Sequence, residues 1–271
     1  MSQPPALPGF GHGLKVIFRM QMRRLIRGRK LRLGLVSCAL ILFAVIAARY
    51  ASARDVGPER SLEIAQDAIT SGFSWGFFKL LAFLLPFLFT SSAIAEEVEG
   101  RTFTYVASRP VSRFAMVLGK WAAGTLLAVG LLVGSGLLLH LIGYATEPTA
   151  LVDQFAETGR TLLALALLGV CYGGICVFWG AVAPDAGGIL AGLYLGVIEW
   201  LVQFLPGSFR LISMNYLGQQ VAGMERAGLM PETAPEIDAI IGGPVILGVG
   251  LLFLFFAGLV VQGSEYRFSK A

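Results

Sequence analysis

The chain has 271 residues, of which 56% are hydrophobic and 14% are charged, and its mean hydropathy is +0.73. A soluble domain carries about a quarter charged residues, so this composition cannot cover a surface that faces water. The same figures exclude disordered, collagen-like and disulfide-scaffold proteins, and they predict an integral membrane protein. The net charge of +4 would suit nucleic acid, but the positions of the charges favour a membrane surface.

Residues 13–28 are the first predicted element, a helix that lies in the membrane surface. Basic residues recur there every four positions and so share one side: Lys15, Arg19, Arg23 and Arg27. A neighbouring apolar stripe consists of Leu14, Phe18, Met22 and Leu25. A basic face against lipid phosphates beside an apolar face in the acyl region is the pattern of an interfacial helix. The alternative is that these charges only set the topology of the chain.

Six apolar stretches follow, each long enough or nearly long enough to cross a membrane, which takes about 20 residues. They cover residues 31–49, 73–95, 115–144, 161–183, 186–205 and 240–262. The sequence shows no strand-like alternation, so we expect an all-α integral membrane protein with one transmembrane domain over residues 1–271. Arginines that flank the first stretch are expected to extend to the membrane surface.

The basic residues predict that both ends of the chain are cytoplasmic. Fourteen of the 21 lysines and arginines fall before the first span, between the second and third spans, in the C-terminal tail, or in the first two turns of the first and third spans. The opposite loops, 50–72, 145–160 and 206–239, are rich in acidic residues. Cytoplasmic loops carry the excess of basic residues, which sets this orientation. The first apolar stretch begins about thirty residues into the chain, which predicts an anchor and not a cleaved signal peptide.

One predicted span carries a carboxylate. At about 100° per residue, one arc of about 80° on the fifth span holds Gly188, Gly192, Gly196, Glu199 and Gln203. Small residues at four-residue spacing let another helix approach closely, and an unpaired Glu199 in lipid would cost several kcal/mol. This face is therefore either a helix contact with a second subunit or the wall of a substrate path. The other interpretation is that Glu199 lies near the outer surface and reaches water.

Two further ionisable side chains fall inside predicted spans. His140 and Lys79 lie near the outer ends of the third and second spans, where we expect them to reach water; a proton relay is the alternative. The three cysteines lie in apolar runs and are expected to pack as apolar side chains. The sequence offers no metal-ligand spacing and no phosphate-binding Gly-rich motif, so we expect no metal or cofactor on this chain.

The loop over 206–239 begins with apolar residues and then becomes polar around the run from Met230 to Pro235. This order predicts short helices that rest on the outer leaflet or dip into it.

The most informative segment lies between the second and third spans. Three carboxylates come first, arginines follow, and a short helix from about Thr102 is expected to end before Pro110, because a residue that precedes proline disfavours helix. A compact charged helix held close to the bilayer suits a cytoplasmic partner. The alternative is a solvated linker whose charges only set topology.

This segment carries a family resemblance. The run Glu97-x-Glu99-Gly-Arg-Thr102, then Ser108-Arg-Pro-Val-Ser-Arg113, then Leu118-Gly-Lys120, resembles the signature of ABC-2 type transporter permeases, close to the nitrous-oxide-reductase maturation subgroup. The resemblance implies an ABC-2, type V exporter-like permease fold in which residues 96–113 couple to an ATP-binding subunit. The coupling residues would be Glu96, Glu97, Glu99, Arg101, Thr102, Arg109, Pro110 and Arg113. In such permeases the region that matches 206–239 shapes the external gate.

The resemblance implies the permease subunit of an ATP-binding cassette exporter in the bacterial inner membrane, which is not itself an enzyme. Its expected partners are a cytoplasmic ATP-binding subunit that holds ATP and Mg, a second permease subunit, identical or different, and membrane lipid, but not nucleic acid. Two other hypotheses stay open. One is an ion-coupled carrier or membrane-embedded enzyme that uses Glu199, His140 and Lys79; the other is a non-transporting anchor for an ATPase-driven envelope machine.

Overall fold

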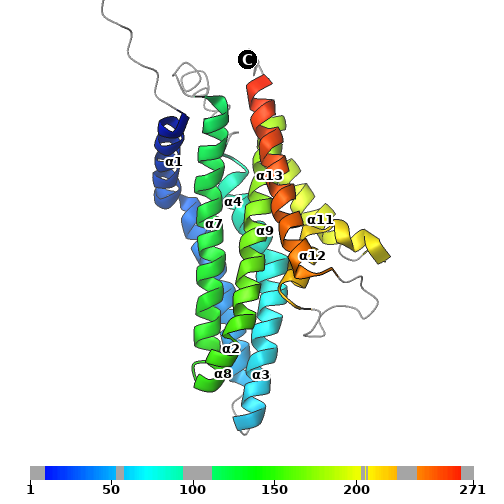
Figure 1. Cartoon of the computed structure of the whole chain (residues 1–271). Helices are drawn as coiled ribbons and strands as arrows, with labels where there is room; N and C mark the ends of the chain where they lie inside the picture. The colour runs from blue at the N-terminus through cyan, green and yellow to red at the C-terminus, as the bar shows by residue number, and fades with distance from the viewer. Residues whose placement is uncertain are drawn as a thin grey trace, which may run out of the picture.

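The computed structural model describes residues 10–52, 58–93, 112–202, 205, 207–224 and 237–263. Within these ranges the regular structure is helical and no strand occurs, which confirms the all-α prediction. The helices form an elongated bundle (Figure 1). α1 and the C-terminal part of α13 lie at one end, which we call the α1 end, and α8 lies at the other, the α8 end.

The elements follow one another in the order that Figure 1 colours from blue to red. They are α1 Phe10–Arg27, α2 Arg29–Ser52, α3 Pro58–Ser71, a π-helical segment Gly72–Leu81, α4 Ala82–Thr90, α7 Arg113–Gly143, α8 Pro148–Asp153, α9 Phe155–Val182, α10 Gly187–Leu193, a second π-helical segment Tyr194–Ile198, α11 Glu199–Val202, a 3₁₀ helix Gly207–Ile212, α12 Met214–Val221 and α13 Ala239–Gly263.

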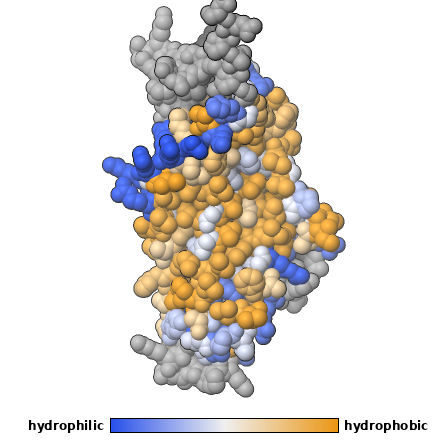
Figure 2. All heavy atoms as spheres, turned by 60° about the vertical axis from the view of Figure 1, so that its left-hand side comes forward, coloured by the Kyte–Doolittle hydropathy of each residue, from blue (hydrophilic) through white to orange (hydrophobic). Residues whose placement is uncertain are grey.

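Five of the described helices are long and apolar enough to cross a membrane. They cover Arg29–Ser52, Arg60–Thr90, Arg113–Gly143, Phe155–Val182 and Ala239–Gly263, and Gly187–Val202 forms a shorter apolar helix. On the face shown in Figure 2, hydrophobic side chains cover the middle of the molecule, with more hydrophilic surface toward both ends. The chain is therefore a multi-pass membrane protein.

The second span begins earlier than its hydropathy predicts. Residues of the predicted loop 50–72 instead form α3, which runs without interruption into the π-helical segment and α4. α3 is amphipathic: its Ala65 and Ile69 are buried, whereas polar residues occupy its other side. A hydropathy count stops where polar residues appear, although the helix continues.

The fifth span departs from a regular helix. A π-helical segment, Tyr194–Ile198, follows α10, and a π-helix places more residues in each turn than an α-helix does. The residues beyond it are therefore rotated relative to the predicted 100° spacing. Glu199 is 2% exposed, whereas an added Cβ at Gly188 or Gly196 would meet nothing within 4 Å. The prediction that Glu199 shares one face with these glycines is thus wrong, and Gln203 lies outside the described residues.

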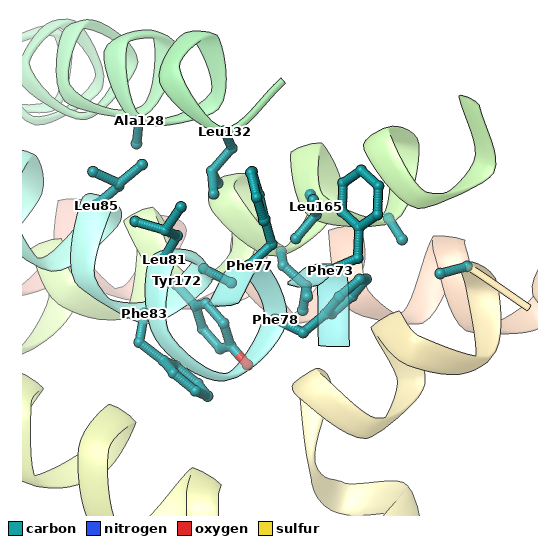
Figure 3. Packing of buried hydrophobic residues seen from close by; sticks show 14 of the residues in the cluster. Phe73, Phe77, Phe78, Leu81, Phe83, Leu85, Ala128, Leu132, Leu165 and Tyr172 are labelled. Carbon is teal, nitrogen blue, oxygen red and sulfur yellow. The ribbon is translucent and has the colours of Figure 1, made fainter. Parts of the chain in front are cut away.

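Aromatic and aliphatic side chains from most of the described helices fill the middle of the bundle. In Figure 3, Phe77 points from the second span toward Leu132 of α7 and Phe73 lies beside Leu165 of α9, and Phe78 belongs to the same cluster. α9 and α13 approach each other most closely where Gly174 faces Gly250, because a Cβ on Gly174 would overlap the Gly250 carbonyl. Only glycine, which has no side chain, leaves enough space at this contact.

The apolar side of α1, which was expected to face lipid, packs against protein instead. Gly13, Ile17 and Leu25 are buried, and an added Cβ at Gly119 of α7 would lie 3.0 Å from Ile17 Cγ2. The predicted apolar stripe is half-buried beside them, apart from Leu25, which is fully buried. The basic residues Lys15, Arg19, Arg23 and Arg27 remain exposed, as expected for either interpretation of their role.

The loop after the fifth span also enters the bundle. All eight residues of α12 are buried, and the helix packs against α9, α13 and the first π-helical segment. Ser213 caps α12 by accepting a hydrogen bond from Tyr216 N at 3.2 Å. The prediction of short helices is confirmed, but α12 lies within protein and not on a leaflet.

Candidate functional site

A buried polar cluster surrounds the first turn of α12. One oxygen of Glu199, Oε1, accepts hydrogen bonds from the Tyr172 hydroxyl at 2.9 Å, from Ser213 Oγ at 3.1 Å and from Asn215 N at 2.7 Å. A carboxylate suits this place, because the N-terminus of a helix presents unpaired N–H groups and a partial positive charge. Figure 3 shows the Tyr172 hydroxyl directed away from the hydrophobic cluster.

The same cluster ties α12 to the second span. Asn215 Nδ2 donates to the carbonyl of Phe78 at 2.7 Å, and Gln219 Nε2 donates to Asn215 Oδ1 at 2.5 Å. The Phe78 carbonyl is in the first π-helical segment. Glu199 therefore neither reaches water nor contacts a second subunit with its carboxylate; it holds α11, α12 and α9 together.

His140 is also enclosed by protein, contrary to the prediction that it reaches water. Its side chain is fully buried, with Nε2 3.0 Å from the carbonyl of Leu151 and Nδ1 2.8 Å from Thr158 Oγ1. These partners lie on α8 and α9, so His140 fixes the chain reversal at the α8 end. Next to it, burial first and the charge of Glu157 second raise the pKa of Tyr144 to about 12.

Arg49, at the end of the first predicted span, is likewise enclosed by protein. Its side chain is 2% exposed, and its Nη2 donates to Thr146 Oγ1 at 2.6 Å. Its guanidinium carbon also lies 4.5 Å from the centre of the Tyr50 ring. The arginine therefore joins α2 to the turn after α7.

Lys79 lies in a different environment from these two residues. Its ammonium nitrogen is 3.4 Å from the centre of the Trp75 ring, and the side chain lines a groove that neither Glu199 nor His140 lines. The structure gives Glu199, His140 and Lys79 separate partners. It thus does not bring together the three groups that the carrier or enzyme hypothesis requires on one cavity.

Hydrogen bonds join several helices at the α1 end, in a region that we call the α1-end junction: Lys30, Ser92, Ala93, Arg113 and Lys120. Lys120 is 1% exposed and its Nζ donates to the Ala93 carbonyl at 2.5 Å. Lys30 donates to Ser92 Oγ. Arg113 Nη1 donates to the carbonyls of Val261 and Gln262 at 3.4 and 3.3 Å, where a cation suits the C-terminus of α13.

The junction flanks the predicted coupling segment on both sides. Ser92 and Ala93 end the described part of the second span, and Ser112 caps α7 by accepting from Ala115 N at 3.1 Å. Of the proposed coupling residues, only Arg113 is described. Those outside the described residues are Glu96, Glu97, Glu99, Arg101, Thr102, Arg109 and Pro110. Gly119 and Lys120, which belong to the resemblance motif, have structural roles: Gly119 admits α1 and Lys120 holds the end of the second span.

Sequence comparison identifies the protein's family. The profile of the ABC-2 family transporter proteins matches residues 16–231, which is most of the chain and includes the junction and the buried cluster. The chain belongs to the ABC-2 transporter family. The apolar helices and this match together make it a membrane-spanning member of that family.

One curated relative is also similar. It is the protein named undecaprenyl-diphosphatase 1 of Acinetobacter baylyi (strain ATCC 33305 / BD413 / ADP1), with 29% identity over 156 residues. The match covers 53% of this chain and 54% of the relative, so the chain spans about half the length of that protein. The diphosphatase activity in that name is a property of the relative.

Proposed function

We propose that this ABC-2 permease is an exporter subunit of the bacterial inner membrane, with both termini and the α1 end in the cytoplasm. A separate ATP-binding subunit, which holds ATP and Mg, docks on residues 96–113. A second permease subunit completes the transporter, and the basic face of α1 contacts the headgroups of the inner leaflet. The motif from Glu97 to Lys120 supports a place near the nitrous-oxide-reductase maturation permeases.

The α1-end junction is the observation that carries this proposal. The residues that flank the coupling segment are hydrogen-bonded to α2 through Lys30, to α7 through Lys120 and to α13 through Arg113. α9 is also in contact, because a Cβ at Gly180 would lie 2.8 Å from the Ser91 carbonyl. A displacement of the coupling segment is therefore passed to four other helices at once.

The mechanism follows from differential contact. ATP binding and hydrolysis can shift the permease between two conformations only if the ATP-binding subunit contacts them differently. Docking on residues 96–113 supplies that difference at a place where the helices are already joined. The spans then rearrange as a group, and the α12 region, which is buried deep in the bundle, is positioned to respond through α9 and the second span.

The proposal is tested with the Glu97→Ala and Arg101→Ala variants, each reconstituted with the ATP-binding subunit. We expect both variants to insert normally and to lose most of the permease-dependent ATP hydrolysis and ATP-driven transport. Rim charges set association, so their loss weakens docking without disturbing the fold. The matched controls, Asp153→Ala and Arg160→Ala, remove exposed charges near the α8 end and should leave hydrolysis unchanged.

Wild-type coupling in both Glu97→Ala and Arg101→Ala would refute docking at this segment. Isolation of the tagged chain separates the remaining hypotheses. A co-isolated ATP-binding chain with ATP-driven transport supports the permease, the same complex without transport supports an anchor, and activity of the isolated chain supports a carrier or enzyme.

A further inference from the structure

A groove on the outside of the bundle runs between α9 and α13, which lie side by side (Figure 1). Leu163 and Leu167 line it on α9, and Ile240, Leu247 and Leu251 line it on α13. Leu163 and Ile240 are 58% and 86% exposed, so the groove opens sideways to the surface. Apart from its end near α12, the groove is lined by apolar side chains, glycine and proline.

Two opposite charges mark that end of the groove: Arg160 on α9 and Asp238 directly before α13. Both side chains are exposed, and within the described part of the chain neither has a hydrogen-bond or ion-pair partner. No charged residue follows Arg160 in α9, and α13 contains none. The two charges therefore lie where the apolar part of each span begins, which is the level of the lipid headgroups.

The two charges also lie at nearly the same depth. α9 and α13 run in the same direction, as shown by two contacts whose residues are both 76 positions apart in the sequence: Leu167 with Gly243 and Gly174 with Gly250. The same offset places Asp238 level with position 162, two residues beyond Arg160. Two residues correspond to about 3 Å along a helix. A positive and a negative charge thus face one groove at one level.

α12 holds the Asp238 end of the groove in place. Ile237 N donates to Gln220 Oε1 at 3.1 Å, and the Asp238 carbonyl accepts from Ile241 N at 2.8 Å and from Gly242 N at 2.9 Å. Main-chain hydrogen bonds therefore fix the backbone on both sides of this residue. A group that is already held in place loses less entropy when it binds a ligand.

The groove has the length of one membrane leaflet. From Asp238 to Leu251 it follows α13 for 13 residues, which is about 20 Å at 1.5 Å per residue. A bilayer is about 40–45 Å thick with its headgroups, so one leaflet takes about 20 Å. A ligand with its head between the two charges and a chain along α13 would therefore end near the middle of the bilayer.

We propose that this groove binds a phospholipid whose headgroup carries both a phosphate and a primary ammonium, in the leaflet at the α8 end. Arg160 binds the phosphate, Asp238 accepts hydrogen bonds from the ammonium, and an acyl chain lies against Leu163, Leu247 and Leu251. Charge complementarity selects this headgroup, because an anionic headgroup without an amine would place its charge beside Asp238. A quaternary ammonium has no hydrogen to donate to the carboxylate. The inference goes beyond the proposed function, since the lipid is a bound component of the permease and not its cargo.

Native mass spectrometry of the full-length permease in detergent measures the binding of the first lipid. The probes are phosphatidylethanolamine, phosphatidylcholine and phosphatidylglycerol with identical acyl chains. We expect phosphatidylethanolamine to bind about tenfold more tightly than either of the others, as suits one charge-assisted hydrogen bond.

Variants of the two charged residues test the headgroup contacts. Asp238→Asn should lower the affinity for phosphatidylethanolamine to that for phosphatidylcholine, and Asp238→Glu should keep the preference. Arg160→Gln should weaken the binding of both lipids, because both carry the phosphate. The matched control is Asp153→Asn, which removes an exposed carboxylate that does not line the groove.

A further variant tests the apolar part of the groove. Gly248→Phe should weaken the binding of all three lipids, because Gly248 lines the groove and an added Cβ there has nothing within 4 Å. Gly130→Phe is its matched control: Gly130 has equally open space, but it lies on α7 and does not line the groove.

Equal affinities for phosphatidylethanolamine and phosphatidylcholine in the wild-type protein would overturn the proposal. So would a preference that survives in Asp238→Asn, or a first lipid whose binding Gly248→Phe leaves unchanged. A dimer that binds no lipid would do the same, because a second copy of the chain then fills the groove. The measurement needs no ATP-binding subunit. Loss of coupling in Glu97→Ala with an intact lipid preference therefore separates the two proposals, as does the reverse result.

Discussion

At the scale of single residues, one carboxylate oxygen organises the deepest polar contacts. Glu199 Oε1 accepts from Tyr172, Ser213 and Asn215, so three donors from two other parts of the chain depend on one acceptor. Buried donors that lose their acceptor cost more than the hydrogen bond contributed. A substitution of Glu199 that removes the charge but keeps an acceptor oxygen should therefore destabilise the protein less than one that removes the oxygen.

We predict that Glu199→Ala lowers the free energy of unfolding by about 2–5 kcal/mol, because it leaves three buried donors unpaired. Glu199→Gln keeps an acceptor oxygen and should cost less, and Tyr172→Phe should cost about 1 kcal/mol. Thermal unfolding in detergent measures each change, with the exposed Glu157→Ala as control. If Glu199→Ala unfolds at the control's temperature, the cluster does not stabilise α12.

The sequence indicates which residues are unusual, but not what they contact. Glu199, His140 and Lys79 are conspicuous as ionisable groups in apolar runs. Glu199 and His140 find partners on other helices, since Glu199 Oε1 accepts from the Tyr172 hydroxyl and His140 Nδ1 lies beside Thr158 Oγ1. The Trp75 ring beside Lys79 belongs to the same helix. Only Ser213 gives a local signal, as a serine able to cap the helix that follows it. The remaining contacts arise from tertiary packing and cannot be read from the composition of the sequence.

At the scale of helices, glycine sets how closely neighbours approach. α9 and α13 cross where Gly174 and Gly250 meet, and a Cβ at Gly250 would lie 2.5 Å from the Cα of Cys171. Without side chains at this crossing, the two backbones pack directly against each other, as in other small-residue membrane contacts. Gly248 of the same helix has nothing within 4 Å of its added Cβ.

We predict that Gly250→Val separates α9 from α13 and lowers the unfolding temperature by several degrees, as overpacking by about 1–3 kcal/mol implies. Gly248→Val adds the same side chain two residues away on open surface and should leave the temperature unchanged. Both variants are compared by thermal unfolding in one detergent. Equal unfolding temperatures would mean that the crossing is not closely packed.

Hydropathy predicts the helical class and the approximate position of the spans, since about 20 apolar residues are a strong signal. It misses α3, because that helix keeps one polar side while Ala65 and Ile69 pack inward. It also misses the π-helical turns, since residue counts assume a constant 100° step. Those turns decide that Glu199 points inward and that Lys79 lines a groove.

At the scale of the whole molecule, the arrangement predicts an orientation that can be measured. The three cysteines Cys38, Cys171 and Cys176 are buried, so the wild-type protein should react slowly with thiol reagents. A single cysteine introduced at the surface then reports its side of the membrane without removal of the native ones. Val152 near the α8 end is 70% exposed, and Arg23 on α1 is exposed.

We predict that an impermeant maleimide labels Val152→Cys in right-side-out vesicles and Arg23→Cys only in inverted vesicles. The expectation follows from the excess of Lys and Arg near the α1 end, which favours a cytoplasmic position. Unmodified protein is the background control. The opposite labelling pattern would place the coupling segment outside the cell and remove the basis of the proposed docking.

The paired π-helical turns have a mechanical consequence for the transport cycle. A turn that contains one surplus residue can revert to α-helix, or pass along the rod to a neighbouring position, at little cost in main-chain hydrogen bonding. When the surplus residue passes along the helix, only the residues between its old and new positions rotate, by about 100°, the angular step of one residue. Such a shift in Gly72–Leu81 or Tyr194–Ile198 reorients the side chains of that segment while both helix ends stay in place and the bundle does not tilt.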